Sequence, residues 1–256
     1  MNSVAFTIGT WPVYWYGILI SAALLIGMFL AQRLAKSRGY DVDKLWSVLL
    51  LMVPAAVVGA RLYYVLFRWD LYGGDPLTIL KVWHGGLAVH GGILGGLLAI
   101  LIGCKIWKLD FFGVLDCVAP ALALGQAIGR WGNFFNGEAY GGVTSLPWGI
   151  HVAADPSLHH PTFLYESLWN LGVLMLLLLM TKNKFKKADG EIFLWYLLLY
   201  GIGRFWIEGL RTDQLLVWGT DIAVSQLLAA VLAVGSGLLI LLIRFVFTGA
   251  GRRRKS

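Results

Sequence analysis

Seven long apolar segments follow one another along this chain, and this repetition restricts the fold more than any other feature. Each segment is close to the roughly 20 residues that a helix needs to cross a bilayer. Of the 256 residues, 58% are hydrophobic and only 14% are charged, whereas soluble domains carry about 25% charged residues. The segments are continuous, unlike the alternating strands of a membrane β-barrel. We therefore predict an all-α membrane protein, a bundle of about seven transmembrane helices that forms a single domain over 1–256. The predicted spans are 13–32, 45–67, 86–107, 111–128, 163–180, 192–207 and 222–245.

Most Lys and Arg residues lie in the connections after the first, third and fifth segments and in the C-terminal tail. Cytoplasmic loops of membrane proteins are enriched in these residues, which predicts an external N-terminus and a cytoplasmic C-terminus. The net charge of +7 is thereby explained by topology, and we expect no nucleic-acid partner. The basic tail 246–256 is predicted to contact anionic lipid. Segment 134–162, which contains glycines and prolines, is predicted to form a small external cap.

A cluster of polar residues follows the fourth apolar segment, within the run 129–142. Arg130, Asn133, Asn136 and Glu138 fall within nine positions and are spaced by glycines that allow close approach to the backbone. The planar guanidinium of Arg binds phosphate through paired donors and keeps its charge. This pattern predicts an anion site at a membrane surface. The alternative interpretation is a helix end with an interfacial Arg.

Under the predicted topology, polar groups from several segments share one depth near the external boundary. Ionisable residues within membrane spans are costly and usually face the bundle interior, so this convergence predicts a polar chamber. Asp116 lies toward the opposite side, and we expect it to make a structural hydrogen bond. The groups at the shared depth are Tyr14, Tyr16, Arg61, His90, Arg130, Tyr165, Glu166, Arg204 and Glu208.

In the sixth segment, Tyr200, Arg204, Glu208 and Arg211 occur at helical spacing and are predicted to share one face. Such a face needs a polar partner, although Arg204 and Glu208 could simply neutralise each other.

The third segment places His90 beside two overlapping small-residue pairs, Gly91 with Gly95 and Gly92 with Gly96. Pairs of this kind let a neighbouring helix approach closely, which would hold His90 between helices. A histidine there is either a proton acceptor or a satisfied core residue. The two cysteines, Cys104 and Cys117, are predicted to be small core residues, and without a Cys/His cluster we expect no metal or cofactor.

These motifs together resemble those of the bacterial prolipoprotein diacylglyceryl transferases, and the resemblance covers nearly the whole chain. The run 129–142 is similar to the family signature through Arg130, Asn133 and the Asn-Gly-Glu at 136–138. The other matching motifs are Trp15-Tyr16-Gly17, His90-Gly91-Gly92, the segment from His160 to Glu166, and the pattern of Tyr200, Arg204, Glu208 and Arg211.

The resemblance implies transfer of the diacylglyceryl group of phosphatidylglycerol to the lipobox cysteine in the signal peptide of a preprolipoprotein. The products are a thioether and glycerol 1-phosphate. It places the protein in the bacterial plasma membrane with an active site on the extracytoplasmic side. A small-anion membrane transporter is the alternative, but it predicts polar groups throughout the membrane or two matched halves.

Given this resemblance, Arg130 and Arg204 are predicted to hold the phosphate, which needs no metal when the bond broken is carbon to oxygen. Asn133 and Asn136 would orient the glycerol oxygens, and Glu208 would fix Arg204. The substrate thiol needs either a base, for which His90 is the candidate, or the positive field of the arginines. Further predicted contact or supporting residues are Tyr16, Arg61, Gly137, Glu138, Glu166, Tyr200 and Arg211.

Overall fold

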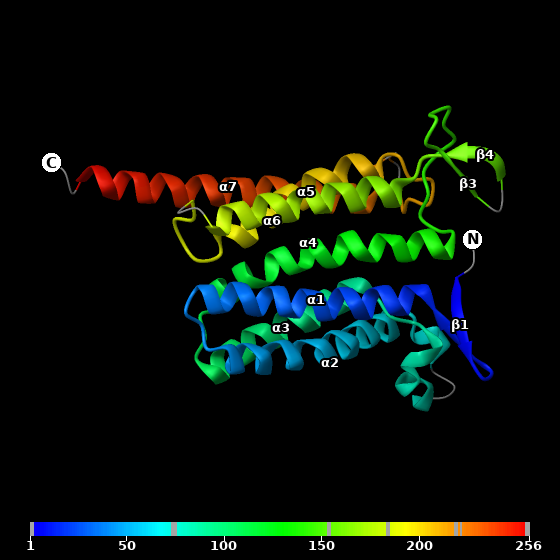
Figure 1. Cartoon of the computed structure of the whole chain (residues 1–256), viewed down its shortest axis with the longest axis horizontal. Coiled ribbons are helices and arrows are strands. Elements are labelled where there is room, and N and C mark those ends of the chain that lie inside the picture. The colour runs from blue at the N-terminus through cyan, green and yellow to red at the C-terminus, as the bar shows by residue number, and fades with distance from the viewer. Residues whose placement is uncertain are drawn as a thin grey trace. The chain divides into compact units, whose positions relative to one another are not determined.

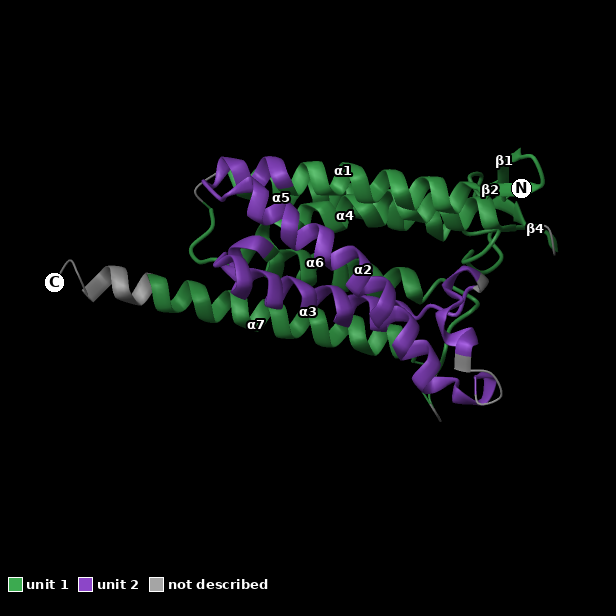
Figure 2. Cartoon of the chain, turned by 90° about the horizontal axis from the view of Figure 1, so that it is seen from below, with its two compact units in different colours: residues 1–31, 115–256 green, residues 32–114 purple. Residues whose placement is uncertain are grey.

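A computed structural model describes residues 3–72, 76–152, 155–182, 185–217, 220 and 222–253. Lys184, Arg254 and Lys255, which contributed to the topology prediction, lie outside the described residues. The chain forms two compact units, shown in Figure 2. Unit 1 contains residues 1–31 and 115–256, and unit 2 contains residues 32–114. Each unit is described by itself.

The described residues form seven α-helices, which confirms the prediction of an all-α membrane protein. Six of them are long and apolar enough to cross a membrane. The exception, α6, has 18 residues and carries three charged side chains, at Glu191, Arg204 and Glu208. The helices are α1 (Trp15–Ser37), α2 (Val42–Phe67), α3 (Val89–Trp107), α4 (Phe111–Asn136), α5 (Thr162–Lys182), α6 (Glu191–Glu208) and α7 (Val224–Arg253).

In unit 2, α2 and α3 approach each other so closely that no side chain fits between them at two levels. A Cβ atom on Gly91 would lie 2.3 Å from the carbonyl oxygen of Gly59, and one on Gly95 would lie 2.4 Å from that of Ala55. Glycine is therefore required at both positions of α3, as the spacing of small residues predicted.

The connection from α2 to α3 contains three short 3-10 helices, η1 (Trp69–Leu71), η2 (Pro76–Leu80) and η3 (Val82–His84). The buried guanidinium of Arg61 on α2 donates hydrogen bonds of 2.7–3.0 Å to four backbone carbonyls of this connection. Its carbon Cζ also lies 5.0 Å from the ring centroid of Tyr72. These contacts fix the connection to α2. The accepting carbonyls belong to Thr78, Ile79, Gly85 and Gly86.

Unit 1 is built around the helices α4 to α7, and α6 packs against both α5 and α7 (Figure 1). Its apolar core consists of small residues on α4 and larger ones on α5 and α6, so the helices interlock. The core residues are Ala119, Ala123, Val173, Leu174, Leu177, Ile192 and Tyr196.

At the start of α6, buried charges join the helices of unit 1. Asp116 on α4 accepts a hydrogen bond of 3.0 Å from the backbone N–H of Phe193 and lies 3.1 Å from Nζ of Lys186. This confirms the structural hydrogen bond predicted for Asp116. Glu191 is fully buried and pairs with Arg244 of α7 at 2.8–2.9 Å. The two pairs connect α4, α6 and α7 at one level.

Two antiparallel hairpins lie outside the helices of unit 1. The first, β1 (Val4–Ile8) with β2 (Trp11–Tyr14), precedes α1 and was not predicted. The second, β3 (Ile150–Val152) with β4 (Asp155–His159), forms part of the predicted cap 134–162. The beginning of that cap is helical, because α4 continues eight residues past the predicted boundary at 128.

Candidate functional site

Three charged side chains from three helices of unit 1 meet at the level where α5 begins. The carboxylate of Glu166 lies 2.5 Å from Nη2 of Arg130 on α4 and 2.7 Å from Nη1 of Arg204 on α6. The carboxylate is 5% exposed, so both arginines share one buried anion. Removing charges from water is costly, so the arginines and the carboxylate of Glu166 can be buried among apolar helices only as partners of one another. The predicted meeting of Arg130 with Arg204 is therefore present.

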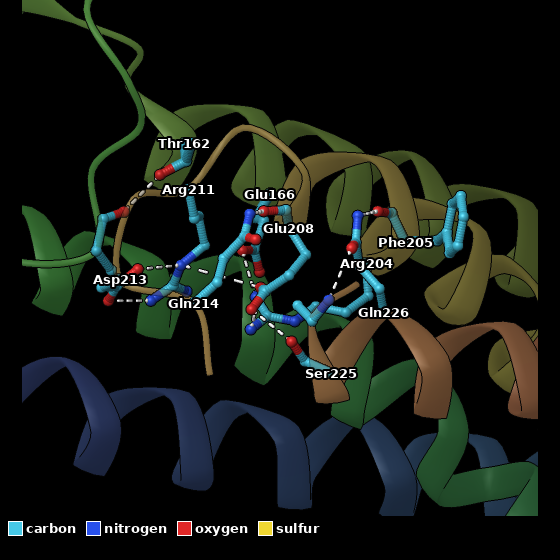
Figure 3. A network of polar contacts seen from close by, with 12 residues as sticks. Thr162, Glu166, Arg204, Phe205, Glu208, Arg211, Asp213, Gln214, Ser225 and Gln226 are labelled. Atoms are coloured by element: carbon cyan, nitrogen blue, oxygen red, sulfur yellow. Dashed lines mark hydrogen bonds and ion pairs between the residues drawn. The ribbon is translucent and has the colours of Figure 1, made fainter. Parts of the chain in front are cut away.

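The charged network continues beyond the end of α6, as Figure 3 shows. Glu208, the last residue of α6, binds Arg204 at 2.6 Å and accepts a 2.5 Å hydrogen bond from the hydroxyl of Ser225. Arg211 lies 3.9 Å from Glu208 and binds Asp213 through two hydrogen bonds of 2.7 and 2.9 Å. We call Arg130, Glu166, Arg204, Glu208, Arg211 and Asp213 the ionic cluster.

The prediction that Arg211 shares a helical face with Arg204 is wrong in its geometry. The helix ends at Glu208, and the backbone turns at Gly209. Arg211 then pairs in a β-bridge with Gly141, where a Cβ atom would lie 2.7 Å from His160. The hydrogen bonds from Arg211 lower the pKa of Asp213, which lies outside the membrane-spanning helices.

The polar segment 129–142 occupies the last two turns of α4 and the residues that follow. Arg130 donates a long 3.5 Å hydrogen bond to Asn133, and the amides of Asn133 and Asn136 donate to one oxygen of Glu138 at 2.9 and 3.1 Å. Gly137 has φ +67°, a left-handed conformation that favours glycine and ends the helix. Arg130 is thus connected to the predicted amides and to Glu138.

A cavity of about 310 Å³ lies between this segment and the second hairpin. Its polar lining includes Asn133, Asn136 and Glu138, and the hairpin contributes Ile150 and His151 of β3. His151 Nδ1 lies 3.0 Å from the carbonyl oxygen of Pro156, which can only accept a hydrogen bond. The hairpin therefore encloses the predicted amides and carboxylate on one side.

Tyr16 of α1 lies against the same segment of α4. A Cβ atom on Gly132 would be 2.5 Å from Cδ2 of the Tyr16 ring, so glycine makes room for the aromatic ring. The neighbouring Trp15 stacks on Phe135, with ring centroids 5.0 Å apart. The glycines of this segment were predicted to let other groups approach the backbone closely, and at Gly132 the approaching group is the ring of Tyr16.

A model of the prolipoprotein diacylglyceryl transferase family matches residues 3–243. The chain belongs to this family. A phosphatidylglycerol–prolipoprotein diacylglyceryl transferase of Thermosynechococcus vestitus is 45% identical over 230 residues, which cover 87% of this chain and 85% of the relative. A relative with the same name in Clostridioides difficile is 46% identical over 85% of this chain and 86% of the relative. Another in Halalkalibacterium halodurans is 42% identical over 93% of this chain and 85% of the relative.

In this member of the diacylglyceryl transferase family, the other predicted site residues have separate surroundings. Tyr200 stacks on Tyr196 one turn along α6, with ring centroids 5.9 Å apart. His90 and Arg61 belong to unit 2. The His90 side chain is exposed, contrary to the prediction that helices would hold it between them, and its ring centroid lies 6.1 Å from that of Tyr63. The donors of Arg61 serve the backbone carbonyls described above.

One residue of the ionic cluster of this transferase is more central than its sequence pattern indicated, and two other residues were not predicted. Glu166 was a supporting residue in the prediction, yet it joins both arginines. A lone carboxylate in an otherwise apolar helix was the available signal. Asp213, which binds Arg211, lies in a polar stretch, and Ser225, which donates to Glu208, is a single hydroxyl near the start of the seventh apolar segment. Neither position carries a comparable signal.

Proposed function

We propose that this chain transfers the diacylglyceryl group of phosphatidylglycerol to the cysteine thiol of a prolipoprotein lipobox, releasing glycerol 1-phosphate. Family membership and the names of its relatives support this activity. The observation that carries the assignment to a site is the convergence of Arg130 and Arg204 on Glu166. Two guanidinium groups held at a fixed separation present paired donors to a phosphate.

The lipid phosphate binds between Arg130 and Arg204 in this proposal. Asn133 and Asn136 contact the glycerol oxygens, supported by Gly137 and Glu138, while Glu208 orients Arg204. Tyr16 borders the site at Gly132, Tyr200 contributes from one turn before Arg204 on α6, and Arg211 lies 3.9 Å from Glu208. Arg61 supports unit 2 structurally because each of its three nitrogens donates to backbone carbonyls.

In the reaction, the thiolate sulfur attacks the glyceryl carbon next to the phosphate. The carbon–oxygen bond breaks, the bonding electrons leave with the phosphate oxygen, and the guanidinium groups stabilise the added negative charge. The thiol proton goes to a base before or during the attack. We propose His90 as that base. Glu166 and Glu208 already neutralise much of the arginine charge, so the field of the arginines alone is weak.

A pH-rate profile of the His90→Asn enzyme distinguishes these two sources of activation. If His90 accepts the proton, the wild-type rate falls on the acidic side of the profile as the base becomes protonated, and the variant lacks this limb. A profile of unchanged shape would assign the activation to the arginines.

The positive residues of the loops support a location for the site. We propose that the N-terminus and the ionic cluster lie on the extracytoplasmic side of the bacterial plasma membrane and that the tail 246–256 is cytoplasmic. Both substrates are then available from the membrane, the lipid directly and the prolipoprotein through its signal peptide.

The test of the proposed function uses purified enzyme, phosphatidylglycerol vesicles and a lipobox peptide, with glycerol 1-phosphate and peptide mass as readouts. Wild type is expected to form both products. Arg130→Lys keeps the charge but loses the paired donors, and should reduce kcat/KM by about 10²-fold. The matched control is Arg68→Lys, because Arg68 is exposed and pairs only loosely with Asp70 at 3.4 Å among the contacts described. Wild-type rates in the Arg130 variant would refute the phosphate assignment.

A further inference from the structure

An apolar groove runs along the surface of unit 1 between α5 and α6. Its volume is about 420 Å³, and its lining is almost entirely carbon. Leu168, Leu176 and Trp206 border it with 57, 46 and 44% of their surface exposed. On a membrane-spanning helix such exposed apolar surface faces lipid, so the groove opens toward the hydrocarbon of the bilayer.

Hydrogen bonds fix the walls of this groove. The indole N–H of Trp169 donates to the carbonyl oxygen of Leu199 at 2.9 Å, and a Cβ atom on Gly203 would fall on the indole ring. At one end, the hydroxyl of Tyr165 lies 3.0 Å from Nε1 of Trp148 and 3.3 Å from Nδ1 of His160. The groove is thus preformed, with a polar rim at Tyr165.

The groove begins at the depth of the ionic cluster. Tyr165 precedes Glu166, and Trp206 lies half a turn beyond Arg204. From there the groove extends along α5 to Leu176, which is about three turns or roughly 16 Å deeper. A lipid whose phosphate lies at the arginines places its acyl chains at this depth.

The size of the groove selects its occupant. A methylene group takes up about the volume of a water molecule, roughly 30 Å³, so the groove holds on the order of a dozen methylenes. A signal-peptide helix about 10 Å across is far too large for it. A single fatty acyl chain fits both the volume and the apolar lining.

We propose that this groove binds one acyl chain of the donor phosphatidylglycerol while its phosphate is held by Arg130 and Arg204. The inference rests on the proposed function. Because the chain leaves bilayer hydrocarbon to enter the groove, the gain is close packing rather than removal from water. The groove therefore aligns the donor lipid and favours chains long enough to fill it.

Gly172 offers a direct test, because it lines the groove and an added Cβ atom there meets nothing within 4 Å. Gly172→Leu should fold normally and fill part of the groove. Gly235→Leu on α7 is the matched control, since a Cβ atom at that position also meets nothing within 4 Å. The KM for dipalmitoyl phosphatidylglycerol should rise about three- to ten-fold in the Gly172 variant only. The KM for dihexanoyl phosphatidylglycerol should stay unchanged in both.

Labelling with phosphatidylglycerol that carries a diazirine midway along one acyl chain gives a readout independent of turnover. Wild type should be labelled on the stretch of α5 from Leu168 to Leu176, and Gly172→Leu should lose most of this label. The proposal is overturned if the KM for dipalmitoyl phosphatidylglycerol, divided by the KM for dihexanoyl phosphatidylglycerol, is the same in Gly172→Leu as in wild type. Labelling of the groove would then show only an ordinary boundary lipid. Failure of wild type to transfer either lipid would instead refute the proposed function, and the labelling would still decide whether the groove binds a chain.

Discussion

Glu166 and Arg204 are 38 positions apart in the chain, yet Oε1 of Glu166 lies 2.7 Å from Nη1 of Arg204. The same carboxylate binds Arg130 through its other oxygen at 2.5 Å. Each oxygen of Glu166 therefore serves one arginine, and the separation of the two guanidinium groups depends on this single side chain.

Replacement of Glu166 by Gln should disrupt this arrangement. The amide can accept from one arginine but presents N–H donors to the other, and it leaves an excess positive charge in a buried site. We expect kcat/KM to fall at least about ten-fold, with a lower Tm in detergent. Asp70→Asn removes a carboxylate of the exposed pair with Arg68 and serves as the control. If the Glu166 variant kept full activity, the carboxylate would not set the arginine geometry.

A second prediction concerns the contact between Gly132 and Tyr16. Gly132→Ala would place Cβ 2.5 Å from the Tyr16 ring, which must then move. Because Tyr16 borders the proposed lipid site, the KM for phosphatidylglycerol should rise several-fold while Tm changes little. Gly125→Ala, on the same helix, has nothing within 4 Å of the new atom and should behave as wild type. Equal KM values in the two variants would exclude Tyr16 from the site.

The pair of Glu191 and Arg244 should support stability rather than chemistry. Glu191→Gln leaves Arg244 without its buried carboxylate, and breaking such a pair typically costs about 3–5 kcal/mol. We expect a clearly lower Tm but an unchanged kcat for the folded enzyme, since Glu191 is at the opposite end of α6 from Glu208. Asp189→Asn, which changes a half-exposed carboxylate, should have little effect on Tm. A selective loss of kcat would contradict this division.

The pH dependence of the Arg211 and Asp213 pair follows from the lowered pKa of Asp213, whose largest cause is the hydrogen bond from Arg211. A carboxyl group with a lowered pKa in the folded state contributes stability above its unfolded pKa of about 3.9 and loses it as the pH falls through the folded value. Tm should therefore be insensitive to this pair from pH 8 to 5 and should fall in more acidic buffer. Asp213→Asn should remove that acid-dependent part, which a series of Tm measurements can detect.

Apolar segment length was sufficient to predict the helices, because hydrocarbon requires continuous helical spans. The polar residues of α4 and α6 also indicated a common site, since charges within spans must find partners. The central position of Glu166 was not evident, because spacing along α5 alone does not show which neighbours it faces. Arg211 was misplaced because the helix ends at Glu208, and the end of a helix is poorly determined by apolar spacing.

Other parts of the fold depended on contacts that a sequence pattern does not reveal. Arg61 looked like a site residue, yet its partners are carbonyls of a connection with no regular apolar pattern. The first predicted span began at Val13 and so included the end of β2, because Val13 and Tyr14 are apolar and β-prone, and periodicity over so few residues does not separate strand from helix.

The ionic cluster contains three arginines and three carboxylates, so its formal charges cancel before any substrate arrives. An incoming anion must therefore compete with Glu166 and Glu208 for guanidinium donors that are already engaged. A free inorganic ion brings nothing else to offset that exchange, whereas a phospholipid also brings its headgroup hydroxyls and its chains. In the proposed site, internal neutralisation of this kind would favour an anion delivered from the bilayer over the salts dissolved outside it.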